Sequence, residues 1–227
     1  MWGRRGRWLY LIAGIAAVAL LAGCIPAAPL NTAQLDDGKC GHNLQLGSDK
    51  NASSSNKPWF ALVGDGGSAS YSITVDGRGV GTFNSDVYGK VCINVTTALS
   101  DGTHTLAGKE LRPNAVYDVA PYTFTVDTVP PPAPSKPVLD PVSDTAPTGD
   151  NATTKTQVRL DGTSGAYMPI QVYDGLKVIG GAGADGSGRW SVTTLTLARG
   201  THSVAAITTD TAGNKSAASP VLSLSIQ

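Results

Sequence analysis

The chain has 227 residues, and its 17 basic and 17 acidic side chains give a formal net charge of zero. Charged residues make up 15% of the chain, whereas 27 glycines and 14 prolines supply many turns. This composition favours short strands over helices, and the lack of a basic patch argues against nucleic acid as a partner.

A positively charged stretch followed by an apolar one opens the chain. Three arginines within the first seven residues precede an uninterrupted apolar run over residues 8–21. Its 14 residues suit the core of a signal peptide and are short for a membrane span, which needs about 20. The next residues, Leu21-Ala22-Gly23-Cys24, resemble the bacterial lipobox, in which a peptidase cuts before the cysteine and the thiol carries a diacylglycerol.

This resemblance implies a lipoprotein signal peptide over residues 1–23 and lipidation of Cys24. An ordinary secretory signal with an incidental cysteine is the alternative. Cleavage removes three arginines and no acidic residue, which leaves 14 basic against 17 acidic residues and a net charge of −3. We therefore expect an exported protein, attached by lipid to the extracytoplasmic face of the bacterial cell membrane. Residues 24–37 lack periodicity and are predicted to form a flexible tether.

The three cysteines fit the same interpretation. If Cys24 carries lipid, Cys40 and Cys92 remain as an even pair in an oxidising compartment. A disulfide between them would close a loop of about 50 residues and stabilise the fold by about 4 kcal/mol on the chain-entropy account. Two free, buried thiols are the alternative. Because Val91 and Ile93 are predicted to point inward, Cys92 should point outward, and the bridge should lie on the sheet surface without crossing the core.

Two stretches of the sequence share the same order of strand and turn signals, about 98 residues apart. The first contains SYSITVDGRGVGTF and DGTHTLAG, and the second contains MPIQVYDGLKVIGG and ARGTHSV. Apolar and polar residues alternate in both, which predicts strands with one buried face. The pairs Asp76-Gly77 and Asp174-Gly175 predict tight hairpins with positive φ angles. Strands spaced by roughly 8–12 residues, without a helical pattern, indicate antiparallel sandwiches.

The second stretch is similar to the bacterial Ig-like repeats of large surface adhesins. DTVPP opens it at Asp127, and the acidic loop SDTAPTGDNATTKT, the strand GRWSV and the loop DTAGN follow in order. The first stretch lacks the DTAGN loop and has Val91 where the second has Trp190. The resemblance therefore implies the fold of both stretches, but a loop function for the second alone.

The expected fold class is all-β, with two tandem antiparallel Ig-like β-sandwiches behind a lipoprotein signal peptide and a flexible tether. The first sandwich is expected over residues 38–127 and the second over residues 128–227. Residues 128–134 between them include four prolines. Proline has a fixed φ angle and no backbone donor, so this segment is predicted to be a stiff, extended linker.

Four acidic residues stand around this linker and in the loops beside it: Asp127, Asp144, Asp150 and Asp210. Carboxylate oxygens are the donors that calcium prefers. Related adhesin repeats are often stiffened by calcium at such seams, so the resemblance implies a structural calcium site, and no other cofactor is expected. The alternative is that these aspartates form turns by hydrogen bonding to their own backbone.

No set of residues in the sequence points to catalysis. His104 and His202 occupy equivalent places in the two repeats and are predicted to be core residues at strand ends. No serine stands in a nucleophile elbow, and no Cys-His-Asp set falls within one repeat. We therefore expect a non-catalytic structural spacer, or an adhesion module with a protein or surface-glycan partner. The alternative is a ligand- or inhibitor-binding lipoprotein, or an accessory subunit of a surface complex. The small number of aromatic residues, with Trp59 and Trp190 at core positions, favours the structural class.

Overall fold

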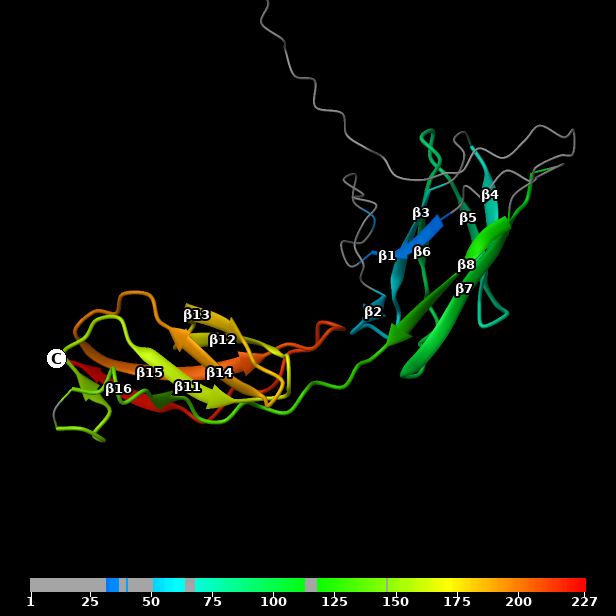
Figure 1. The fold of residues 1–227 in the computed structure, drawn as a ribbon. Helices are drawn as coiled ribbons and strands as arrows, with labels where there is room; N and C mark the ends of the chain where they lie inside the picture. Colours follow the sequence, from blue (N-terminus) through cyan, green and yellow to red (C-terminus); the bar gives the residue numbers. More distant parts are fainter. Residues whose placement is uncertain (1–31, 37–39, 41–50, 64–67, 113–117, 146) are drawn as a thin grey trace, which may run out of the picture.

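The computed structural model describes residues 32–36, 40, 51–63, 68–112, 118–145 and 147–227. These residues form sixteen strands and no α-helix, so none of them makes a helix able to cross a bilayer. Figure 1 shows the strands gathered into two bodies that are joined by an extended segment. The predicted signal peptide and Cys24 lie outside the described residues.

The first body is a sandwich of a three-stranded and a five-stranded sheet. The three-stranded sheet has the order β1-β3-β6, with β1 at Thr32–Leu35, β3 at Trp59–Val63 and β6 at Lys90–Asn94. The five-stranded sheet has the order β2-β8-β7-β4-β5, and its strands are β2 at Ala52–Ser53, β8 at Asp118–Val126, β7 at Gly102–Glu110, β4 at Ser70–Val75 and β5 at Arg78–Asn84.

The second body repeats this topology strand for strand. Its three-stranded sheet has the order β14-β11-β9, with β14 at Arg189–Thr193, β11 at Arg159–Thr163 and β9 at Val138–Leu139. Its five-stranded sheet has the order β10-β16-β15-β12-β13, and its strands are β10 at Ala152–Thr153, β16 at Leu222–Ile226, β15 at Gly200–Thr208, β12 at Pro169–Asp174 and β13 at Lys177–Gly183. The prediction of two tandem all-β sandwiches is confirmed.

The first sandwich begins earlier than the sequence indicated. Residues 32–35, which were predicted to be part of the flexible tether, form β1 and pair antiparallel with β3. Ala33 and Leu35 on this strand are 2% and 4% exposed, so β1 belongs to the core. The tether boundary at residue 37 and the domain start at residue 38 are therefore wrong. Two apolar residues in a four-residue edge strand give too short an alternation to stand out in the sequence.

The prediction of purely antiparallel sheets needs one correction. The two-residue strands β2 and β10 each pair in parallel with the last long strand of their sandwich, β8 and β16 respectively. The other strand pairs are antiparallel, as expected. Two residues are too few for a sequence pattern to give a strand direction.

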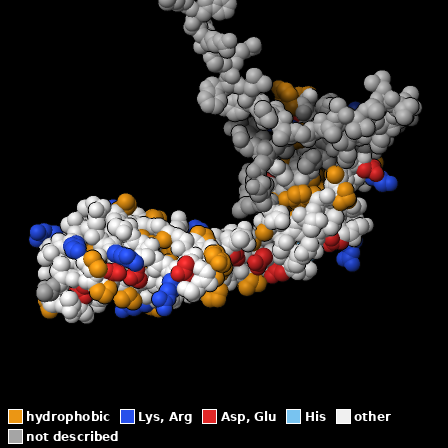
Figure 2. Space-filling model, viewed as in Figure 1, with side chains coloured by type: hydrophobic (Ala, Val, Ile, Leu, Met, Phe, Trp, Pro, Cys, Tyr) orange, Lys and Arg blue, Asp and Glu red, His pale blue; other side chains and the backbone are white. Residues whose placement is uncertain are grey.

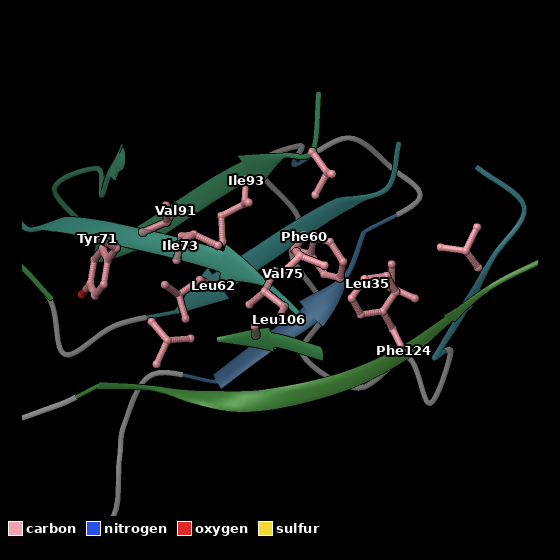
Figure 3. Packing of buried hydrophobic residues seen from close by; sticks show 14 of the residues in the cluster. Leu35, Phe60, Leu62, Tyr71, Ile73, Val75, Val91, Ile93, Leu106 and Phe124 are labelled. Atoms are coloured by element: carbon pink, nitrogen blue, oxygen red, sulfur yellow. The ribbon is translucent and has the colours of Figure 1, made fainter. Parts of the chain in front are cut away.

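The inward-facing residues that the alternation predicted fill both cores. In the first sandwich Ile73 and Ile93, from opposite sheets, are fully buried. Phe60 packs edge to face against Phe124, with 4.8 Å between ring centroids. Figure 3 shows these side chains packed between the two sheets, with Leu35 of β1 among them. The second sandwich has a separate core of the same kind, so each body buries its own apolar side chains.

Candidate functional site

A disulfide joins Cys40 to Cys92, with 5.5 Å between the two Cα atoms. Cys92 is exposed on the outward face of β6, between the buried residues Val91 and Ile93. Its cross-strand neighbour on β3, Ala61, is fully buried although it lies on the outward face. The predicted bridge and its predicted place on the sheet surface, away from the core, are thus confirmed.

The two equivalent histidines each hold an aspartate from the nearby β-hairpin. His104 Nδ1 lies 2.7 Å from Asp76 Oδ2, and its Nε2 lies 2.8 Å from the carbonyl oxygen of Ser100. His202 Nδ1 lies 2.7 Å from Asp174 Oδ2 in the second sandwich. Each ring thereby ties a hairpin to the loop that precedes β7 or β15. The predicted placement at the inward face of a strand end is confirmed for His104, which is 8% exposed and contacts Phe124. His202 is only half-buried.

The sequence contains both members of each Asp–His pair at a constant spacing, but the interaction between the two side chains was not predicted. Asp76 and His104 are 28 residues apart, and Asp174 and His202 have the same separation. The two hairpins nevertheless differ. Asp76 has a φ of 52° in its turn, whereas Asp174 is the last residue of β12 and does not adopt a positive φ. The prediction of a positive φ at Asp174 is therefore wrong, and Gly175 alone, with a φ of 57°, supplies it in the second hairpin.

Hydrogen bonding within these pairs shifts the pKa values of His104, Asp76 and His202. The Asp76 carboxylate raises the pKa of His104 above its ordinary 6.5, and the Asp174 carboxylate does the same for His202. His104 in turn lowers the pKa of Asp76 below 3.8. A raised histidine pKa stabilises the fold at low pH, and this contribution is lost as pH rises through the folded-state value. The lowered pKa of Asp76 stabilises the fold above pH 3.8, and this contribution is lost on acidification.

We expect the stability of the first sandwich to be greatest between about pH 4 and pH 6.5, where Asp76 is ionised and His104 is protonated. Its unfolding temperature should fall between pH 6 and pH 9, and the variant His104→Gln should flatten this decline. Thermal unfolding over a pH series measures both effects. His202→Gln serves as the matched control, because it should alter the pH profile of the second sandwich alone. Identical pH profiles for wild type and His104→Gln would contradict this role.

Hydrogen bonds from both sandwiches hold the junction between them, here called the seam. Asn214, at the end of the DTAGN loop, donates from Nδ2 to the backbone oxygen of Asp127 at 2.7 Å and to Asp210 Oδ2 at 2.9 Å. In the same loop Ala212 accepts a hydrogen bond from the backbone of Ser54, on the first sandwich, at 3.1 Å. The first linker residue, Thr128, is bonded through its N and Oγ1 to the carboxylate of Asp101.

The structure does not bring the four predicted calcium ligands together. Asp127 and Asp210 lie at the seam, where both are bonded to Asn214. Asp144 and Asp150 instead lie near β10, whose Ala152 pairs with Ser225 at the opposite end of the second sandwich. Strand β15, which is nine residues or roughly 30 Å long, separates that end from the DTAGN loop. A single site built from all four carboxylates is therefore excluded.

The observed role of these four acids is to accept backbone hydrogen bonds in turns. Asp127 accepts from Val129, Asp144 from Gly149, Asp150 from Ala152, and Asp210 from Gly213 and Asn214. Across the part of the chain that the structure describes, no three His, Cys, Asp or Glu residues come together in a metal-binding group. The arrangement agrees with the alternative in which the aspartates stabilise turns.

We expect the variant Asn214→Ala to loosen the seam, because Asn214 connects Asp127 to the DTAGN loop. Losing the two hydrogen bonds should cost roughly 1–3 kcal/mol of local stability and should broaden the distribution of inter-domain angles in solution scattering. Asp86→Ala is the control, because Asp86 makes similar backbone hydrogen bonds in the turn before β6, at the other end of the first sandwich. If Asn214→Ala and the wild type gave the same scattering profile, the stiffness of the junction between the sandwiches would come from the prolines.

Comparison with known proteins agrees with this fold. No curated protein matches the chain. A solved structure of fibronectin(III)-like modules of CbhA from Clostridium thermocellum is 11% identical, with a TM-score of 0.53, and the match covers 86% of this chain and 94% of that one. The BSP domain of a biofilm associated protein is 17% identical, with a TM-score of 0.31 and 87% of this chain covered. This chain spans 30% of the length of that protein.

A family comparison adds a match in sequence to this likeness in fold. Residues 131–227 match the family described as the bacterial Ig-like domain. The matched range begins within the linker and includes all strands of the second sandwich, from β9 to β16. The resemblance inferred from DTVPP, GRWSV and DTAGN is thus confirmed for this part of the chain. The second sandwich is therefore similar in sequence to bacterial Ig-like domains.

Proposed function

We propose that this protein is a non-catalytic bacterial surface lipoprotein that holds two Ig-like modules away from the membrane. Cys24 would carry the lipid anchor. The modules act as a spacer and present a binding surface to a protein or a surface glycan. Export to an oxidising compartment accounts for the Cys40–Cys92 disulfide.

The observation that carries the proposal is that the described chain enters the first sandwich at the end opposite the second sandwich. Thr32, the first residue of β1, pairs with Val63 at one end of the first sandwich. The other end holds Thr128 of the linker through Asp101 and bonds to the second sandwich through Ser54. A chain anchored at Cys24 therefore places the second sandwich on the far side of the first from its anchor.

The surface of the second sandwich supports a spacer or protein-binding role over a small-molecule site. Figure 2 shows its hydrophobic side chains scattered among charged ones on the visible face. Trp190 is 3% exposed and lies in the core, so it offers no flat aromatic platform to a sugar or ligand. Ig-like sandwiches commonly bind partners through end loops or exposed strand edges.

The experiment that tests the anchor is the substitution Cys24→Ser. Without its thiol, the chain should either be released from the membrane fraction or remain there with its signal peptide uncut. Membrane fractionation and mass spectrometry of the mature N-terminus measure the result. Cys92→Ser is the control, because it removes a cysteine but leaves the lipobox intact. A wild-type protein whose mature N-terminus carries no lipid would overturn the proposal.

A further inference from the structure

An exposed apolar pair stands on a well-fixed turn of the first sandwich. Val87 and Tyr88, between β5 and β6, are 74% and 76% exposed. Asp86 fixes the turn, because its Oδ1 accepts hydrogen bonds from the backbone of Tyr88 at 2.8 Å and of Lys90 at 2.9 Å. Gly89 completes it with a φ of 77°. Two large apolar side chains are thus presented to solvent on a defined backbone.

The second sandwich has the same turn with no apolar residue within it, although the exposed Tyr167 from a neighbouring loop lies against Gly186. Asp185 there accepts hydrogen bonds from the backbone of Ser187 and Arg189, and Gly188 has a φ of 79°. The positions of Val87 and Tyr88 are taken by Gly186 and Ser187. The fold of the turn therefore does not require apolar residues, and their exposure in the first sandwich calls for another explanation.

A third position shows the same contrast. Leu111, just after β7, is 52% exposed, and its backbone N–H donates to the oxygen of Ser70. In the second sandwich Thr209 makes the equivalent bond to Pro169. We call Val87, Tyr88 and Leu111 the tether-end patch. The equivalent positions of the second sandwich hold one glycine and two hydroxyl residues. In the second sandwich this end faces the seam.

The strand register places the tether-end patch beside the start of β1. Thr32 pairs with Val63, and Val63 pairs with Lys90, the last residue of the turn. Two strand spacings therefore separate Thr32 from Lys90, or about 10 Å. Ser70 pairs with Asn84, which brings Leu111 to the same end. The chain from Cys24 enters the sandwich at this end, opposite the linker.

We propose that the tether-end patch docks onto the lipid bilayer and so sets the angle at which the two modules leave the membrane. This inference rests on the proposed lipidation of Cys24. Cys24 precedes Thr32 by eight residues, which span at most roughly 28 Å when fully extended, so the anchor keeps the patch near the bilayer surface.

The chemistry of the patch suits the interfacial region of a bilayer. Tyrosine is enriched there because its ring is apolar and its hydroxyl reaches water. Val87 and Leu111 add apolar surface beside it. Three side chains bind weakly from free solution, but a tether turns their contact into an intramolecular event at high effective concentration. The tether thus compensates for the small size of the patch.

The test measures membrane contact at the patch without requiring lipidation. The mature chain is prepared with a hexahistidine segment in place of Cys24 and attached to phosphatidylcholine vesicles that contain a nickel-chelating lipid. Tyr88→Trp introduces a fluorescent reporter at the patch, and Ser187→Trp introduces one at the matching turn of the second sandwich. The unsubstituted chain gives the background from Trp59 and Trp190. Emission is compared in vesicles with brominated and unbrominated acyl chains.

We expect the fluorescence of Tyr88→Trp to be weaker in brominated than in unbrominated vesicles, and its emission maximum to shift to shorter wavelength. The fluorescence of Ser187→Trp should show neither change. Adding Val87→Asp to Tyr88→Trp should abolish both changes. If the two reporters respond equally, or neither responds, membrane docking is wrong, and a protein partner becomes the better account of the patch. This outcome is independent of the Cys24→Ser experiment, so docking and lipidation can fail separately.

Discussion

Reduction of the Cys40–Cys92 bridge is expected to lower the free energy of unfolding of the first sandwich by about 4 kcal/mol. The two cysteines are 52 residues apart in sequence, so the bridge restricts a long loop of the unfolded chain. For a domain of this size, such a loss corresponds to a drop in Tm of roughly 15–30 °C. Calorimetry with and without reductant measures it directly.

The second sandwich provides the internal control for this experiment, because it contains no cysteine. Its transition should keep the same temperature after reduction, so the two transitions should separate. The double variant Cys40→Ser/Cys92→Ser should reproduce the effect without reductant. A first-domain transition that does not move on reduction, or two free thiols in the unreduced unfolded protein, would contradict the prediction.

The variant Gly162→Leu is expected to destabilise the second sandwich by about 3 kcal/mol or more. A Cβ atom on Gly162 would lie 2.2 Å from ring carbon Cζ2 of its cross-strand partner Trp190, which is 3% exposed. Overpacking a filled core commonly costs about 1–3 kcal/mol, and a leucine here must displace a whole indole ring. Urea unfolding of the second domain measures the loss. Gly183→Ala is the neutral control, because a Cβ at Gly183 meets nothing within 4 Å.

The first sandwich indicates how this loss can be recovered. At the equivalent strand positions it pairs Leu62 with Val91, two residues of moderate size, where the second sandwich pairs Gly162 with Trp190. The double variant Gly162→Leu/Trp190→Val should therefore regain most of the stability that Gly162→Leu loses. It also removes the indole Nε1, a buried donor without a hydrogen-bond partner in the described structure. If the double variant were no more stable than Gly162→Leu, the idea that a smaller residue at position 190 makes room for a larger one at position 162 would be wrong.

The sequence alone determined the fold class and the repeat, and it predicted the disulfide that the structure contains. Long strands such as β4 and β6 repeat their apolar residues every second position, so their buried faces can be assigned without coordinates. The same alternation places Cys92 outward, between two buried neighbours, and so predicts a bridge on the sheet surface. These features depend on residues close together in the chain, and such local patterns are visible in a sequence.

The tertiary structure alone decided which distant residues meet. Asp76 and His104 come together because β4 and β7 pair in one register, and a spacing of 28 residues does not reveal that contact by itself. The separation of Asp150 from Asp210 likewise follows from their places at opposite ends of the second sandwich. Strand β1 became a strand because β3 offers it hydrogen bonds and the core buries Leu35. In each case register and burial, which are set by the whole sandwich, decided the outcome over local sequence.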